Sequence, residues 1–380
     1  MSAHESGNDL MKRFERVWMC ALLSLPCMPA FAAPLWEGTI GKAAVVVQFD
    51  PAHPTEEGAY FYRRHLLDIR LNRETGGDMM EGEQGVHWRM QAPQGDAWRG
   101  AWVGKDGREQ PISLHALAVP AAGDDADAQR RQAQALYEKQ RLRDLTLKPG
   151  ARETRGKFQI QWWEEPRSKI LSLQVVAGYP EPVRAKINKV LRERQWDDVG
   201  SYFQCLSDPH GDEYSQTVTL RYIDTDAISV SIFTSYSCGG AHPDFGDNPV
   251  TIDARTGEAL QLEDVLYLGK GTPPTYKPNG SSDAFFAYRD KTFAPWLAKT
   301  MKQLHPKDMP KIGADGDGCD YNDSSVWQFP SWYLTPAGIY LGPSFARVMR
   351  ACEYPDWSVL PWKVVRAHAG RIKLGADVAQ

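Results

Sequence analysis

Residues 216–236 have the sequence QTVTLRYIDTDAISVSIFTSY. β-Branched and aromatic residues alternate with polar ones on both sides of Asp224-Thr225-Asp226. This is the composition of two strands joined by a turn, since such residues pack well on a pleated surface and Asp tolerates turn geometry. The stretch therefore predicts an antiparallel hairpin formed by residues 216–223 and 227–236.

The segments around this hairpin predict an α+β domain over residues 157–370 with a mostly antiparallel sheet and two helices. The first helix begins at Tyr179-Pro180-Glu181-Pro182, because apolar residues then recur at i, i+4, i+7 and i+8. The second is expected from Ser282 to Leu304 with a kink at Pro295, which has no amide hydrogen. Its predicted buried side is Phe285, Phe286, Phe293, Trp296, Leu297 and Met301. Further strands are predicted at 158–163, 170–176, 250–253, 327–334, 338–341 and 360–365.

The chain has 380 residues, which suggests two domains. Residues 33–118 contain short alternating runs separated by turns, so we expect a small antiparallel β domain that can close into a barrel. Residues 119–156 are expected to be a linker with a solvated helix at 129–145, ended by Pro149-Gly150. Residues 371–380 are expected to form a tail.

Residues 1–32 have the pattern of a secretory signal peptide. Basic residues near Met11 precede an apolar run from Val17 to Met28, and Ala30-Phe31-Ala32 supplies small residues for cleavage after Ala32. The first ten residues are polar, so both Met1 and Met11 are candidate starts. The apolar run is too short to span a bilayer, and we expect the mature chain to be released into the periplasm without a membrane span.

Four cysteines remain in the expected mature chain. In an oxidising compartment they suggest two disulfides, with three possible connectivities. Proximity along the chain favours Cys205–Cys238 and Cys319–Cys352. No Cys-x-x-Cys pair is present, so the sequence predicts no zinc site and no cofactor. The net charge of −4 argues against nucleic acid as a partner.

Four segments in order resemble the RsiV-like family, the lysozyme-binding extracytoplasmic domain type of an anti-sigma factor. They cover roughly residues 165–366. The matching segments are Tyr179-Pro180 to Asn188, Tyr236 to Pro243, Ile252 to Leu266, and Trp332 to Tyr340 with Trp357 to Val365. Unlike that member, the chain has no recognisable transmembrane or cytoplasmic part, has four mature cysteines and has its own N-terminal β domain. The resemblance therefore implies only extracytoplasmic binding of a protein, such as a lysozyme-like muramidase.

The candidate binding loop comprises Tyr236, Gly239, Gly240, Ala241, His242 and Asp244. The two glycines can present His242 and Asp244 to a partner, or they can serve a tight bend in the sheet. His242 with Asp244 and Asp247 could also act as an acid–base pair or as metal ligands. We expect neither, because a lone His before Pro more often fills a hydrogen-bonding niche.

Two other motifs are weaker. Residues 315–323 are rich in Asp and Asn like a calcium loop, but their spacing does not fit an EF-hand. Residues 342–346 resemble a nucleophile elbow in which Ala346 replaces the second glycine.

No complete catalytic constellation is found, so the leading hypothesis is a soluble periplasmic binding or inhibitory protein. The alternatives are an envelope enzyme that acts on peptidoglycan or another glycan, and a structural docking module.

Overall fold

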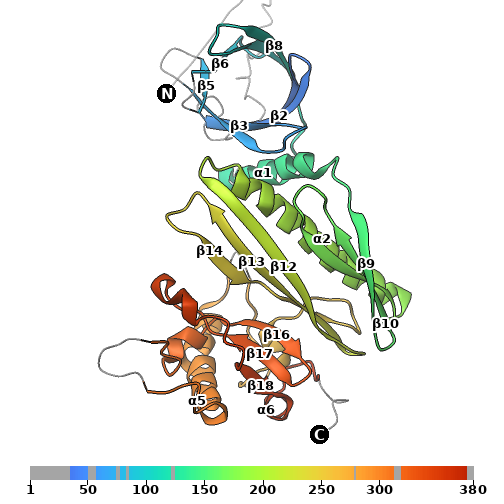
Figure 1. Cartoon of the computed structure of the whole chain (residues 1–380), viewed down its shortest axis with the longest axis vertical. Helices are drawn as coiled ribbons and strands as arrows, with labels where there is room; N and C mark the ends of the chain where they lie inside the picture. The colour runs from blue at the N-terminus through green and yellow to red at the C-terminus, as the bar shows by residue number, and fades with distance from the viewer. Residues whose placement is uncertain are drawn as a thin grey trace, which may run out of the picture.

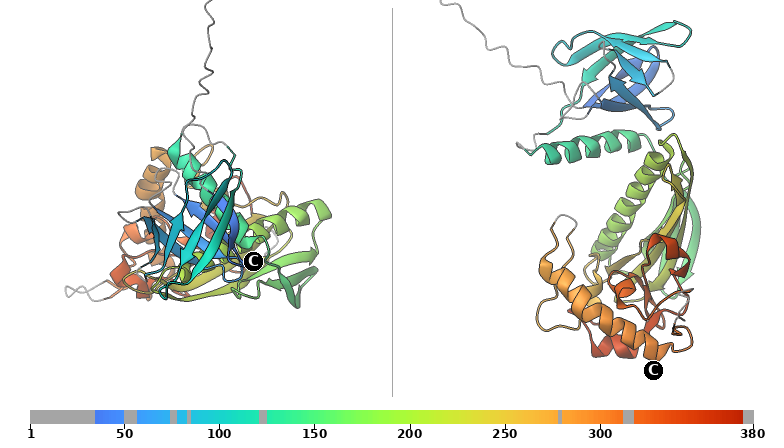
Figure 2. Two further views of the ribbon diagram at one scale, coloured as in Figure 1. Left: turned by 90° about the horizontal axis from the view of Figure 1, so that it is seen from above. Right: turned by 90° about the vertical axis from the view of Figure 1, so that its left-hand side faces the viewer.

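The computed structural model describes residues 35–49, 57–73, 78–82, 85–120, 125–277, 280–311 and 318–374. A β-barrel lies at one end of the molecule, and the C-terminal third lies at the other (Figure 1). Helix α1 lies between the barrel and helix α2 (Figure 2). The expected signal peptide falls outside the described residues. No helix within them is long and apolar enough to cross a membrane.

The N-terminal domain is a closed antiparallel barrel in which each strand pairs with the next and β1 pairs with β8. This confirms the predicted β domain and its closure. Its strands are β1 (Leu35–Ile40), β2 (Ala43–Phe49), β3 (Glu57–Tyr62), β4 (Asp68–Arg73), β5 (Met79–Glu81), β6 (His87–Met90), β7 (Ala97–Val103) and β8 (Glu109–Ala116).

Strand β2 is apolar on both faces because both faces are covered. Val45 and Val47 lie in the barrel core, whereas Val46 packs outward with Phe61 and Tyr137. Successive side chains of a strand point to opposite faces. A strand whose inner face lies in the barrel core and whose outer face lies under a helix therefore needs apolar residues at consecutive positions.

Helix α1 (Ala126–Leu142) begins at Asp125, whose side chain accepts from the Asp127 amide. The predicted linker helix is present, but the prediction that it is solvated is wrong, since Ala133, Tyr137 and Arg141 are buried. Small, aromatic and charged residues make this contact, which a search for apolar residues misses. The Arg141 guanidinium donates to both carboxylate oxygens of Asp68, at 2.8 and 2.9 Å, and lies over the Phe61 ring.

The second domain begins within the predicted linker. Strand β9 (Lys148–Arg155) pairs with β10 (Phe158–Glu164), which pairs with β11 (Leu171–Ala177). Helix α2 (Glu181–Leu206) follows, with Pro182 in its first turn, where a missing amide hydrogen costs nothing. Ile187 and Leu191 of its predicted apolar stripe are buried.

The predicted hairpin forms β12 (Gly211–Ile223) and β13 (Ala227–Cys238). The carboxylate of Asp224 accepts the amides of Asp226 and Ala227 and so closes the turn. Strand β13 also pairs with β14 (Asp244–Asp247) and with β15 (Val250–Asp253). One core joins α2 to β10, β11, β12, β13 and β15.

The C-terminal third contains α3 (Leu262–Val265), α4 (Asp283–Tyr288), a π-helical turn (Arg289–Phe293), α5 (Ala294–Leu304) and α6 (Trp362–Ala367). It also contains β16 (Ser331–Thr335), β17 (Gly338–Gly342) and β18 (Val359–Pro361), with 3₁₀ turns η2 (Ser324–Trp327) and η3 (Arg347–Cys352). The kink predicted at Pro295 is the π-helical turn just before it.

Several predictions for this region are wrong. The α+β class and the antiparallel pairing predicted for the second domain are confirmed, but its strands form three small sheets and it has more than the two expected helices. Residues 362–365 begin α6 instead of ending a strand, because Trp362 and Val365 are spaced to be buried on one helical face. Phe286 is exposed. Within the expected tail, Leu374 is buried and Arg371 pairs with Asp264 at 2.6 Å.

The two disulfides join Cys205 to Cys238 and Cys319 to Cys352, the pairing that proximity favours. The first ties the end of α2 to the end of β13. The second ties η3 to the segment that precedes η2.

We expect Arg141→Met to lower the free energy of unfolding by about 3 kcal/mol, because it leaves the Asp68 carboxylate without its cation at the junction of barrel and helix. Guanidinium-induced unfolding measures this. The control is Arg131→Met in the same helix, where the side chain is exposed and the expected change is within about 0.5 kcal/mol. Equal effects of the two substitutions would contradict the structural role of Arg141.

Candidate functional site

The candidate loop lies at the turn between β13 and β14. Gly239 has a φ of +81°, and a Cβ there would lie 2.0 Å from the Asp208 carboxylate. Only glycine fits this position. Gly240 has no such constraint, and it is exposed together with Ala241 and His242. One glycine therefore serves the bend, and the rest of the turn forms an exposed tip.

The 3₁₀ turn η3 holds this loop from the side. The Arg347 guanidinium donates to the carbonyl oxygen of His242 at 2.9 Å. The Arg350 guanidinium pairs with the Asp244 carboxylate at 3.0 Å and donates to the carbonyl oxygen of Phe245. Charge-assisted hydrogen bonds of this kind are stronger than neutral ones, so the loop is fixed although its tip is exposed.

Arg350 is the centre of this arrangement. Its second nitrogen lies 3.6 Å from the Glu353 carboxylate, which in turn accepts the Phe345 amide at 2.7 Å. Its guanidinium also lies over the ring of Phe245, 5.1 Å from the centroid. One side chain thus joins β14 to η3 and to the segment after β17.

Tyr354 supplies a second connection. Its hydroxyl oxygen accepts the Asp247 amide at 3.0 Å, and its ring contacts those of Phe233 and Phe245. Its φ is +61°, a left-handed conformation that costs a non-glycine residue about 1–3 kcal/mol. Its hydrogen bond and its two ring contacts hold it there, and such strain is concentrated at functional sites.

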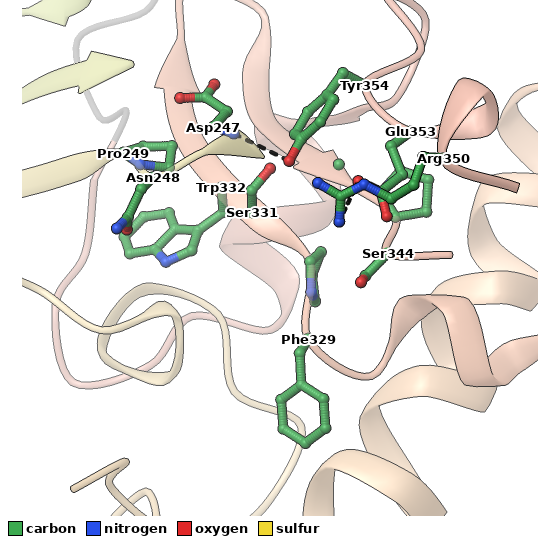
Figure 3. A pocket seen from close by; sticks show the side chains of 13 residues that line it. Asp247, Asn248, Pro249, Phe329, Ser331, Trp332, Ser344, Arg350, Glu353 and Tyr354 are labelled. Carbon is green, nitrogen blue, oxygen red and sulfur yellow. Dashed lines mark hydrogen bonds and ion pairs between the residues drawn. The ribbon is translucent and has the colours of Figure 1, made fainter. Parts of the chain in front are cut away.

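Two hollows flank β14. A cavity of about 330 Å³ lies between β14, β16 and η3, and Figure 3 shows Ser331, Tyr354 and Arg350 around it with Phe329 at its edge. A groove of about 560 Å³ on the other side runs to α2 and is lined by Tyr236, Cys238, Tyr214 and Asp198. Asp247 and Asn248 line both hollows.

The structure does not assemble the acid–base pair that His242 could have formed with nearby carboxylates. The His242 imidazole makes no hydrogen bond or ion pair with the described residues, and Asp244 is paired with Arg350. Asp247 accepts from the Ser231 hydroxyl at 2.7 Å and from the Ile232 amide at 2.8 Å. Burial raises the pKa of Asp247, while these two hydrogen bonds lower it by less.

The weaker motifs have structural roles where they are described. Asp315 and Asp317 lie outside the described residues. Asp320 and Asp323 accept backbone amides of their own turns, and Asp323 caps η2. No group of three potential metal ligands occurs within the described ranges. Ser344 lies in a segment without regular secondary structure between β17 and η3, and a 3₁₀ turn follows it instead of an α-helix, so residues 342–346 do not form a nucleophile elbow.

Sequence reasoning did not find Arg347, Arg350 or Tyr354. Both arginines contact the loop or the residue after it across 105 residues of chain, and Tyr354 contacts Asp247 of β14 across 107. The only signal was the predicted Cys319–Cys352 disulfide, which marks residues beside Cys352 as rigidly held.

Comparison with known proteins leaves the family open. No family model matches the sequence, and no curated protein matches it. Among solved structures, the chain is similar to a DUF3298 family protein from Pseudomonas aeruginosa PAO1, at 17% identity, covering 59% of this chain and 94% of that one. The TM-score is 0.28. We draw no conclusion about function from a likeness at this level, and it does not assign the RsiV-like family.

We expect Asp247→Asn to stabilise the protein at neutral pH. Asparagine can still accept the Ile232 amide and can donate to Ser231, and it carries no buried charge. The pKa of Asp247 is higher in the folded protein than in the unfolded chain. Between these two pKa values the folded protein binds more protons than the unfolded chain, so its stability falls as the pH rises through that range. The advantage of the variant should therefore shrink as pH falls toward the unfolded pKa of about 3.9, and disappear below it.

Urea unfolding of both proteins across pH 3–7 measures this difference. The exposed Asp356→Asn serves as control, with an expected change within about 0.5 kcal/mol at each pH. A variant that is less stable than the wild type at neutral pH would show that the folded protein stabilises the ionised form of Asp247, which would contradict the prediction.

Proposed function

We propose that this protein is a soluble periplasmic binding or inhibitory protein that recognises a protein partner through the tip of the β13–β14 turn and the adjoining η3. The observation that carries this proposal is a surface that is exposed yet fixed. Gly240, Ala241 and His242 face solvent, while Arg347 and Arg350 hold the backbone beneath them. A preformed surface pays little ordering entropy on binding.

The same surface carries an apolar anchor. Val348 is 91% exposed, the highest exposure among the large hydrophobic residues described. It follows Arg347, which is bonded to the loop, and it lies within a turn closed by the Cys319–Cys352 disulfide. A partner that covers Val348 would remove its apolar surface from water, which favours binding.

One structural feature and one sequence feature support the expected compartment. The chain has two disulfides, as exported proteins often do, and its first residues have the pattern of a signal peptide. For the partner we propose a lysozyme-like or other peptidoglycan-active enzyme, the class that the RsiV-like resemblance of the loop segment implies. Nothing in the described site forms a complete acid–base or nucleophilic constellation, and this favours binding over the enzyme alternative.

We expect Val348→Asp and His242→Ala each to weaken binding of a cognate lysozyme-type enzyme at least tenfold, or about 1.4 kcal/mol. Calorimetric titration of the wild-type chain against a panel of animal and bacterial lysozymes identifies the partner, and inhibition of cell-wall lysis gives a second measurement.

The matched control is Val176→Asp, an exposed valine on β11, which should leave binding unchanged. Absence of binding to every enzyme of the panel would refute this choice of partner. Equal losses in Val348→Asp and Val176→Asp would refute the assigned surface.

A further inference from the structure

The cavity between β14, β16 and η3 contains two polar atoms that the protein does not satisfy. Nε of Arg350 and Oγ of Ser331 are buried and have no hydrogen-bond partner among the described residues. Both residues line the cavity. Burying an unpaired polar atom costs stability, and a native protein keeps such atoms where they serve a ligand or ordered water.

Further polar groups surround these two atoms from separate elements. Asn248 comes from the segment after β14, Ser344 from the segment after β17, and Tyr354 from the segment after η3. The Tyr354 oxygen already accepts the Asp247 amide, so its hydroxyl hydrogen is a further donor toward a ligand. The cavity therefore offers donors and acceptors around one space of about 330 Å³.

The charges in this cavity disfavour an anionic ligand. The Arg350 guanidinium is paired with the carboxylates of Asp244 at 3.0 Å and Glu353 at 3.6 Å, and Asp247 lines the same space. Three carboxylates therefore face one guanidinium, and the local field repels an anion. The other polar side chains of the lining are uncharged hydroxyls and an amide, which suit a neutral ligand.

An exposed aromatic surface adjoins the cavity. Phe329, which lines it, is 49% exposed, and its ring centroid lies 6.2 Å from that of Phe286, which is 45% exposed. Tyr276, 49% exposed, packs on Phe285, which also contacts Phe286 and Phe329. Exposed hydrophobic residues gathered in this way mark an interaction site, whereas single ones do not.

We propose that this cavity and the adjoining aromatic surface bind a neutral oligosaccharide. A sugar ring combines hydroxyls, which both donate and accept, with apolar C–H faces that pack on the negative faces of aromatic rings. One sugar unit would occupy the polar cavity and pair with Arg350 and Ser331, and the following units would lie on Phe329 and Phe286. This ligand class is separate from the protein partner proposed above, although Arg350 contributes to both surfaces.

The test uses the chain without its first 32 residues. It is titrated calorimetrically with cellotetraose, maltotetraose, the tetrasaccharide of N-acetylglucosamine and, as a charged comparison, tetragalacturonate. We expect saturable binding of at least one neutral tetrasaccharide, and weaker binding of the charged one.

Ser331→Ala should weaken that binding about tenfold without lowering the melting temperature, because it removes an unpaired buried hydroxyl. Phe329→Ala should weaken it as well. Ser113→Ala, at an exposed position of the barrel, is the matched control and should have no effect.

Three results would overturn the proposal: no binding of any neutral tetrasaccharide, tighter binding of tetragalacturonate, or wild-type affinity in Ser331→Ala. Binding of lysozyme-type enzymes is measured on the same variants. If Phe329→Ala impaired only enzyme binding, the aromatic surface would belong to a protein interface instead. Loss of enzyme binding in Val348→Asp with sugar binding retained would separate the two proposals.

Discussion

The arrangement of the candidate site depends on the guanidinium of Arg350. It binds Asp244 and the Phe245 carbonyl on one side and Glu353 on the other. Without it, β14 would keep its pairing with β13, its contacts with Tyr354 and the hydrogen bond from Arg347 to the adjoining turn. Because β14 is a short strand at the edge of its sheet, a cation that joins it to η3 decides whether the exposed turn has one conformation or many.

The fixed turn has consequences on both of its sides. Outward, it presents Gly240, Ala241 and His242 beside Val348. Inward, the same side chain lines the polar cavity, and its Nε is buried without a hydrogen-bond partner among the described residues. The barrel contributes to neither surface. It is joined through the buried Arg141 to α1, and Ser207, at the end of α2, accepts the amide of Asp68 from β4.

Local patterns in the sequence predict what local chemistry determines. The hairpin at Asp224, the start of α2, the kink before Pro295 and the β character of the N-terminal domain follow from turn residues and periodicity. The contact of α1 with the barrel was not predicted, because an arginine in a helical pattern indicates a solvent-exposed face, and Arg141 is buried. The site was predicted only in part: the loop could be located, but Arg350 contacts it across 105 residues, and no pattern in one sequence reports such a pairing. Phe286 was assigned to the core because its apolar character does not show whether neighbouring chain covers it.

Hydrogen–deuterium exchange of the backbone amides of residues 244–247 tests the central claim most directly. If Arg350 fixes the loop, these amides exchange in the wild type about as slowly as those of β15. In Arg350→Gln they should exchange at least about tenfold faster, with β15 unchanged, because charge-assisted hydrogen bonds are lost. Arg192→Gln in α2 is the control and should change neither strand. Rapid exchange of residues 244–247 in the wild type, or the same slow rates in Arg350→Gln, would contradict a preformed binding surface.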